Sequence, residues 1–286
     1  MKQFPRTEVG GISVPRMIVG TNWFLGFSHC TAAKDILIKE SVANRKSIAD
    51  ILEVFFNAGI NAVMGLARSP LIEAIKDVED RTGVKATLVS TPTLPITPEV
   101  LKFGFNTDEF KNILDNEVKA GSTFCMPHTC ATDVLLDKCT REIRRMDELC
   151  KMIRERGMIP GLSTHVPETI IYADETRLDV ETYISIYNSM GFLMQLEVDW
   201  VSRIIHDAKK PVMTIKPMAA GQLRPFQALN FVWNTIRPQD MVTVGTMTPD
   251  EAKELIDLSM SILERKESKI VLQETRSKAT VKAKKN

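Results

Sequence analysis

Four side chains that could exchange protons follow short apolar runs of this chain. His29, His128 and His165, three of its four histidines, come shortly after such runs, and Lys216 ends another. Imidazole titrates near neutral pH, so His128 and His165 are candidates for the acid and base of a lyase or isomerase. The alternative is one structural histidine beside a residue that hydrogen-bonds the substrate.

Lys216 admits two interpretations. A desolvated amine has a lowered pKa and could form a Schiff base with a carbonyl compound. The second role is an ammonium that faces a phosphate or carboxylate of the ligand. We therefore group Lys216 with the two histidines as candidate catalytic residues.

Imidazole and thiolate groups also raise the question of a metal. A zinc or iron site could draw on five residues, His29, Cys30, His128, Cys130 and His165. The spacing of His128 and Cys130, two residues apart, is not that of a CxxC motif. We expect no metal site and keep these five residues only as candidates, with hydrogen-bonded pocket or loop residues as the alternative.

The elements that must position these groups are short, continuous apolar runs, which are typical of parallel strands buried on both faces. Eight such runs occur, at 17–20, 61–66, 86–91, 123–127, 158–163, 181–187, 212–216 and 241–245. Helical spacing occupies the intervals, as at 46–59, 70–83 and 136–157. The pattern predicts an α/β fold, a (β/α)8 TIM barrel, with an open doubly wound sheet as the alternative.

Two further segments refine the barrel. The sequence TEVGGISVPR predicts an N-terminal hairpin that could plug the bottom of the barrel. The sequence VGTMTPDE predicts a helix start after the eighth strand, with Thr248 as N-cap. Its free N–H groups, with Gly221, could form a phosphate seat. Ordinary helix capping is the alternative, because Asp250 and Glu251 already occupy the positive end of the helix.

The order of these motifs resembles the aldo-keto reductase superfamily over residues 6 to 265. The resemblance rests on TEVGGISVPRMIVGTNWF, NAGINAVMG, PGLSTH, Tyr187-Asn188, KPMAAGQL and VGTMTPDEAKEL. It implies a bound nicotinamide dinucleotide, NAD(P). The residues that the resemblance places around the dinucleotide are Asn188, Lys216, Gly221, Leu223, Gly245, Thr246, Met247, Thr248 and Glu254. Glu251 stands where the family often carries arginine, which favours NADH over NADPH.

The chain departs from the family at the catalytic positions. The aspartate of the family would fall at Met64 and its tyrosine near Ser69. Its lysine should end the third strand, where only Ser90, Thr91 and Thr93 are present. His128 corresponds to the histidine of the family. A reductase needs a proton donor to the developing alkoxide, so the standard mechanism is not expected here.

Composition bounds the remaining possibilities. With 286 residues, 44% of them hydrophobic, the chain predicts one domain over 1–264 and a basic tail over 265–286. The net charge of +1 gives no reason to expect nucleic acid or membranes as partners. Five cysteines, an odd number, indicate reduced thiols.

Without a signal-like segment, we expect a cytoplasmic protein. The leading hypothesis is an enzyme for a small carbonyl- or phosphate-containing metabolite, and a non-catalytic ligand-binding barrel is the alternative. The sequence gives no prediction of the oligomeric state.

Overall fold

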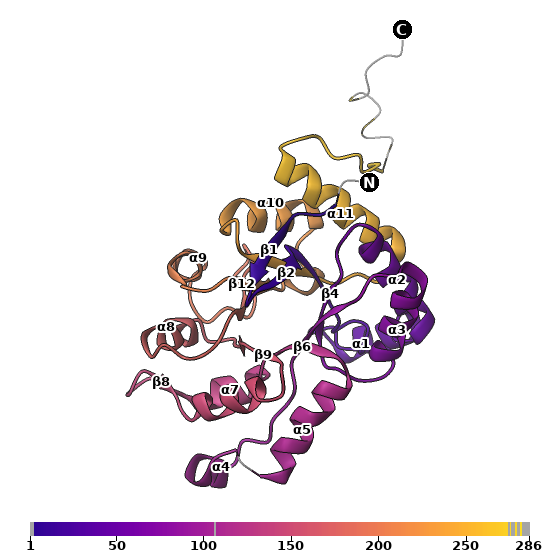
Figure 1. Ribbon diagram of the computed structural model, residues 1–286. Helices are drawn as coiled ribbons and strands as arrows, with labels where there is room; N and C mark the ends of the chain where they lie inside the picture. Colours follow the sequence, from indigo (N-terminus) through magenta and orange to yellow (C-terminus); the bar gives the residue numbers. More distant parts are fainter. Residues whose placement is uncertain (1–2, 106, 274, 276–277, 279–280, 282–286) are drawn as a thin grey trace.

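The computed structural model describes residues 3–105, 107–273, 275, 278 and 281. Its centre is a ring of parallel strands with helices around the outside (Figure 1). The last helix ends at Glu264, and the predicted basic tail beyond it lies partly outside the described residues. Within the described part, Lys269 N and Ser268 Oγ both donate to Asp257 Oδ2, so the chain turns back onto the last helix.

The parallel strands pair in the order β10, β11, β12, β13, β3, β4, β5, β6, β9. Their bounds are β3 Met17–Gly20, β4 Ala62–Gly65, β5 Thr87–Ser90, β6 Ser122–Cys125, β9 Ile159–Pro160, β10 Leu162–Ser163, β11 Tyr183–Ile186, β12 Val212–Ile215 and β13 Met241–Val244. Strands β9 and β10 are two halves of one segment, so the two ends of the sheet meet there and close the barrel. The predicted (β/α)8 architecture is confirmed.

Gly161 separates the two halves of that segment. A Cβ atom at this position would lie 2.7 Å from Met126 Cε and 2.8 Å from Thr182 O, so no side chain fits. The segment contacts β6 on one side, where Phe124 pairs with Ile159, and β11 on the other, where Leu162 pairs with Tyr183. Closure of the ring thus depends on glycine at this position.

Helices follow the strands and cover the outer face of the barrel (Figure 1). They are α1 Ala32–Ser41, α2 Arg45–Asn57, α3 Leu71–Thr82, α4 Pro98–Phe103, α5 Asp108–Lys119, α6 Thr129–Leu135, α7 Met146–Arg154, α8 Glu168–Glu175, α9 Val198–Asp207, α10 Pro225–Thr235 and α11 Pro249–Glu264, with a short 3-10 turn η1 at Ala219–Gly221. No helix of the described residues is long and apolar enough to cross a membrane.

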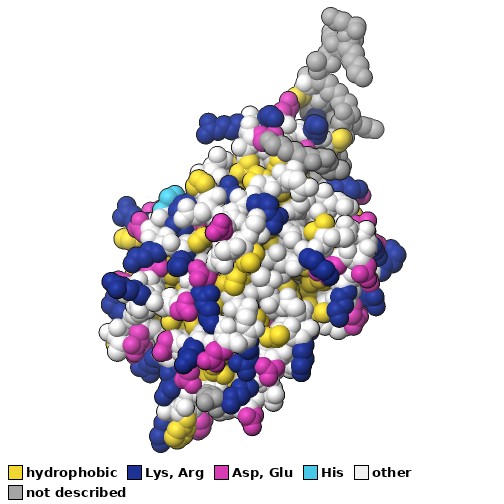
Figure 2. Space-filling view, viewed as in Figure 1, with side chains coloured by type: hydrophobic (Ala, Val, Ile, Leu, Met, Phe, Trp, Pro, Cys, Tyr) yellow, Lys and Arg dark blue, Asp and Glu magenta, His cyan; other side chains and the backbone are white. Residues whose placement is uncertain are grey.

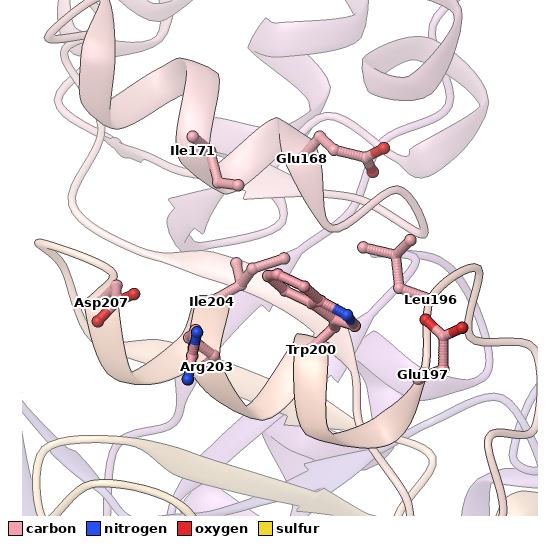
Figure 3. Close-up of a pocket in the computed structure, with 8 residues that line it drawn as sticks. All are labelled: Glu168, Ile171, Leu196, Glu197, Trp200, Arg203, Ile204 and Asp207. Carbon is pink, nitrogen blue, oxygen red and sulfur yellow. The ribbon is translucent and has the colours of Figure 1, made fainter.

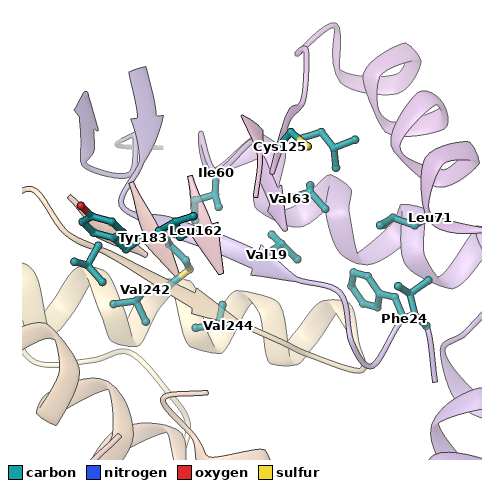
Figure 4. Close-up of a cluster of buried hydrophobic side chains, with 14 of the residues drawn as sticks. Val19, Phe24, Ile60, Val63, Leu71, Cys125, Leu162, Tyr183, Val242 and Val244 are labelled. Atoms are coloured by element: carbon teal, nitrogen blue, oxygen red, sulfur yellow. The ribbon is translucent and has the colours of Figure 1, made fainter. Parts of the chain in front are cut away.

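Alternate residues of each strand face two different cores. Val19, Val63 and Val242 point outward, toward the helices, in the large cluster shown in part in Figure 4. Their neighbours Ile18 and Ala62 point into the barrel, in a second, smaller cluster. This two-residue period places strand side chains on both faces in apolar surroundings, which explains the continuous apolar runs of the sequence.

The N-terminal hairpin, β1 Arg6–Val9 and β2 Ile12–Pro15, is present as predicted. Val9 and Val14 belong to the interior cluster of the barrel together with Met241, which begins β13. The hairpin therefore packs into the end of the barrel where the strands begin.

The helix predicted over 136–157 is wrong in its first half. A small hairpin, β7 Leu136–Asp137 and β8 Glu142–Ile143, precedes α7. The Asp137 carboxylate accepts from Cys139 N at 2.8 Å and also pairs with Arg144, so a local turn forms in place of the helix. The charges that suggested an exposed helical face instead serve this turn.

The surface carries both signs of charge. Figure 2 shows Lys and Arg side chains interspersed with Asp and Glu over the visible face. Many of them pair, as Arg45 does with Asp77 and Arg141 with Glu175. A ligand must therefore be recognised by a local site on this face, because no large field of one sign is available there.

Candidate active site at the mouth of the barrel

A cavity of about 910 Å³ opens where the barrel strands end. Residues at or just after the carboxyl ends of seven strand segments line it, which is where barrel enzymes place their active sites. These residues are Thr21, Leu66, Thr91, His128, His165, Lys216 and Gly245. The three predicted catalytic residues, His128, His165 and Lys216, thus share one cavity.

Lys216 directly follows β12 and lines this cavity. Its backbone is left-handed, with φ of 59°, a conformation that non-glycine residues rarely adopt. The Nζ atom lies 3.2 Å from His29 Nε2. Among the described residues, no carboxylate lies within 4.0 Å of this amine, unlike the many paired lysines of the surface.

His29 reaches Lys216 from the loop between β3 and α1. Its Nε2 also lies 2.7 Å from Asn22 Nδ2. An ammonium can only donate, so Nε2 accepts from Lys216 and the proton of the neutral ring resides on Nδ1. Cys30 Sγ, next in the chain, lies 3.4 Å from the Ala220 carbonyl oxygen, which ties this loop to the segment after β12. His29, one of the five metal candidates, is thus a direct hydrogen-bond partner of Lys216.

One carboxylate that sequence reasoning missed joins the segments that carry His128 and His165. Asp133 accepts from Thr164 Oγ1 at 2.5 Å and from His165 N at 3.1 Å. It also accepts from Thr129 Oγ1, one helical turn earlier in α6. Asp133 therefore fixes the loop after β6 against the loop after β10. The four-residue spacing of Thr129 and Asp133 is the signal that could have indicated it.

The tautomer of His128 follows from its role as N-cap of α6. Its Nδ1 accepts from Cys130 N at 3.2 Å, so the proton of the neutral ring lies on Nε2. His128 lines the cavity, so this N–H is a donor for an oxygen atom of a ligand.

The site favours the neutral forms of its titratable groups. Burial lowers the pKa of Lys216 to about 8. Burial and then the charge of Lys216 lower the pKa of His165 to about 4, and the same two causes lower the pKa of His29 and His128. The pKa of Lys216 therefore lies just above neutral pH. The three imidazoles are uncharged at neutral pH.

The five metal candidates are not arranged as ligands. Within the described part of the chain, no three His, Cys, Asp or Glu side chains form a group that could hold a metal ion. Cys30 contacts a carbonyl oxygen, and Cys130 is exposed. The histidine nitrogens that would bind metal instead accept hydrogen bonds from Lys216 and Cys130.

The end of the cavity near β13 contains the predicted phosphate seat. Thr248 Oγ1 accepts from Glu251 N at 3.1 Å, and Glu251 Oε2 accepts from Met247 N at 2.7 Å. These are the bonds of ordinary capping, the alternative reading of this segment. Thr246 is buried, lines the cavity and has an Oγ1 without a hydrogen-bond partner among the described residues. The segment predicted as a phosphate seat thus combines capping bonds with one buried hydroxyl that has no partner among the described residues.

The residues expected around a dinucleotide divide into two groups. Six of them line the cavity, namely Lys216, Gly221, Leu223, Gly245, Thr246 and Glu254. Met247 and Thr248 instead cap α11, as described above. Asn188 is buried, and its side chain bonds Met190 N and Phe192 N and O, so its polar atoms are used within its own turn.

Solved structures of similar fold include three aldo-keto reductases. One from Pseudomonas aeruginosa, described by that family name, matches with a TM-score of 0.65 and 16% identity, over 92% of this chain and 97% of that one. A second, from Brucella melitensis, matches with a TM-score of 0.59 and 12% identity, over 92% and 98% of the two chains.

A third, from a deep-sea metagenome library of the Medee basin, matches with a TM-score of 0.57 and 9% identity, over 94% of this chain and 98% of that one. The fold is aldo-keto reductase-like. No family model matches the sequence, and no curated protein matches it.

The residues that the sequence resemblance matched to the aspartate, tyrosine and lysine of the family have different surroundings in this fold. Met64 is buried and lines the cavity. Ser69 is exposed, and its Oγ donates to Glu73 Oε1 at 2.9 Å. Thr91 and Thr93 line the cavity, whereas Ser90 is buried against the Phe124 carbonyl oxygen.

A second, smaller cavity of about 360 Å³ lies outside the aldo-keto reductase-like barrel, between α8 and α9 (Figure 3). Trp200 and Ile204 of α9 face Ile171 of α8 across it, and Glu168 and Glu197 stand at one end. Among the residues that the structure describes, no histidine, cysteine or lysine lines it. The titratable side chains named above line the cavity at the mouth of the barrel instead.

Proposed function

We propose that this chain is an enzyme that acts on a small carbonyl-containing metabolite by proton transfer, as an isomerase or lyase does. The observation that carries the proposal is the Lys216 amine, which lines a cavity with three histidines and has no carboxylate partner among the described residues. Perturbed titratable groups that converge in a cavity favour a catalytic role over a structural one.

The standard reductase mechanism is not part of this proposal. That mechanism needs a proton donor tuned by a neighbouring cation, and Met64 cannot supply or tune one. Ser69 is exposed and bonded to Glu73, outside the cavity lining. Of the family's catalytic set only His128 has a counterpart in the cavity.

The groups present suit proton transfer next to a carbonyl. His128 directs an Nε2–H donor at the position of a substrate oxygen, which stabilises negative charge as it develops there. Lys216, with a pKa of about 8, accepts a proton from carbon more readily than His165, whose pKa is about 4. We assign Lys216 as the base, His128 as the hydrogen-bond donor and His165 as a neutral contact of the substrate.

An anionic group on the substrate would find a partner in Arg224. This residue lines the cavity and is exposed, and its guanidinium has no hydrogen bond or ion pair with the other described residues. A guanidinium binds carboxylate or phosphate through two parallel hydrogen bonds. We therefore propose a carbonyl compound that carries a carboxylate or phosphate.

Solvent exchange tests the proposal without knowledge of the product. The protein is incubated in D2O with a panel of oxo acids and sugar phosphates, and loss of the proton signals next to the carbonyl is followed by NMR. We expect exchange with the wild type and at least a tenfold loss in His128→Ala, whose oxygen contact is missing. If no compound exchanges although ligands bind, the protein is the non-catalytic barrel instead.

A second candidate function is nicotinamide dinucleotide binding, which the fold implies. The unpartnered Thr246 hydroxyl favours it, and Gly221 and Gly245 leave open space at the cavity wall. Glu251 opposes it, because its carboxylate holds the Met247 amide that a phosphate would use. A titration of the protein with NADH, followed by fluorescence, tests this function directly.

A further inference from the structure

Lys216 is constrained in position as well as in charge. It begins a stretch in which Ala219 and Ala220 also have positive φ, of 49° and 56°. Such backbone conformations are held only where the surroundings enforce them, and they often occur at functional sites. Here the stretch is followed by Gly221 and is tied to the opposite loop through Cys30, so the amine is fixed at the cavity wall.

The amine also has an unused lone pair whenever it is neutral. Its hydrogen-bond partner is an acceptor, His29 Nε2, at 3.2 Å, which orients the nitrogen through one of its N–H groups. Asp35, an acid that lines the same cavity, accepts from Ser28 N at 2.8 Å. Asp35 is thus not a partner of the amine, and its oxygen atoms could not donate to the lone pair in any case.

We propose that Lys216 is a nucleophile that forms an imine with an aldehyde or ketone substrate. This inference rests on the proposed function for its substrate class and deepens it by giving Lys216 the role of nucleophile in place of base, because a nitrogen held in an iminium cannot accept the proton from carbon. The nitrogen attacks the carbonyl carbon, a C–N bond forms, and the proton lost by nitrogen moves to the alkoxide oxygen. A second proton from solvent lets this oxygen leave as water, which gives an iminium without any change of oxidation state.

Two features of the site support this step. Burial lowers the pKa of Lys216 from 10.5 to about 8, which raises its neutral fraction at neutral pH by roughly 300-fold. His128 offers its Nε2–H to the carbonyl oxygen and so polarises the bond under attack. His29 is a positioning residue, because it orients the amine without contact to the reacting carbon.

Reductive trapping tests the imine. The folded full-length protein is incubated with glycolaldehyde and cyanoborohydride at pH 7.5, and labelled lysines are identified by peptide mass spectrometry. We expect Lys216 to label at least about tenfold faster than any other lysine. Lys34→Arg is the matched control, because Lys34 also lies near the mouth, over the ring of Trp23, and should leave this label unchanged.

The variant Lys216→Arg keeps the positive charge and should lose the label. If it does not fold, the wild-type pH profile decides, since labelling of Lys216 should have a midpoint near pH 8 and surface lysines a midpoint near 10.5. Equal labelling of Lys216 and surface lysines, or a midpoint for Lys216 near 10.5, would overturn the proposal.

The two proposals fail in distinguishable ways. Exchange in D2O that depends on His128, without a fast label on Lys216, would leave proton transfer intact and remove the imine. A fast, specific label on Lys216 without exchange in any carbonyl compound would leave a reactive lysine and remove the proposed isomerase or lyase function.

Discussion

Strand β12 has a partly buried cation near each of its ends, and the two cations have opposite surroundings. Where the strand begins, Arg237 donates to both oxygens of Asp240, at 2.9 and 2.8 Å, and Val212 N donates to the same carboxylate. Where the strand ends, Lys216 has a neutral imidazole 3.2 Å away and no carboxylate partner among the described residues.

The difference separates a structural charge from a chemical one. At the closed end, the Arg237 side chain is 11% exposed and Asp240 is fully buried, so each charge depends on the other. At the open end, the charge of Lys216 is costly to keep, and the amine releases its proton easily. Substitutions and a change of pH should therefore affect the two ends differently.

Removal of the closed-end cation should have the largest effect. Arg237→Met leaves the Asp240 carboxylate buried without its partner, and we expect a loss of about 3–5 kcal/mol in the free energy of unfolding, measured in urea. The control is Arg141→Met, which breaks an exposed pair with Glu175 and should cost less than about 1 kcal/mol. Similar losses in both variants would contradict the comparison.

Removal of the open-end cation should affect activity instead. Lys216→Met replaces a partly buried amine with an apolar chain of similar length, so the free energy of unfolding should stay unchanged or rise. Exchange of substrate protons in D2O should fall about 100-fold. Lys34→Met serves as the control for both measurements. A less stable protein with unchanged exchange would show that Lys216 is structural.

Acid should weaken the open end through His165. Its pKa is about 4 in the folded protein and 6.5 as a free side chain, so the unfolded chain binds the proton more tightly. Stability should therefore fall as the pH drops from 6.5 to 4, by about 1–2 kcal/mol after allowance for solvent screening. Thermal melts of His165→Asn should show a smaller fall over this window, and those of His206→Asn the wild-type fall.

The smallest effect concerns the cavity near α11. Glu251→Gln removes a carboxylate from the predicted phosphate seat but keeps an acceptor for Met247 N. We expect NADH to bind about threefold more tightly, as measured by fluorescence titration. Asp250→Asn, in the same helical turn but outside the cavity lining, should change little. Equal affinities for the Glu251 variant and the wild type would show that no phosphate approaches this seat.

The fold could be predicted from the sequence because each strand of the barrel has its own apolar run. Each parallel strand is buried on both faces, so runs such as 241–245 stand out without knowledge of their neighbours. The helix prediction over 136–157 is wrong in its first half because one side chain, Asp137, organises a local turn. Helical periodicity in the sequence cannot reveal such a turn. A single hydrogen-bonding side chain there outweighs a helical pattern of charges.

The candidate site was predictable in its members and not in its contacts. Strand ends place His128, His165 and Lys216 at one mouth, which follows from topology alone. The His29–Lys216 contact joins residues 187 positions apart through an irregular loop, and His29 itself has φ of 59°. No periodic pattern in the sequence indicates the path of such a loop. The contact between His29 and Lys216 could therefore be found only from the structure.

The hairpin of β1 and β2 limits the path by which a ligand enters and leaves the barrel. Since Val9 and Val14 fill the end where the strands begin, a ligand in the barrel enters and leaves through the same opening. In the proposed enzyme, substrate, product and water would then use it in turn. A bulky product would block the next turnover until it departed, so the width of the mouth would determine speed as well as selectivity.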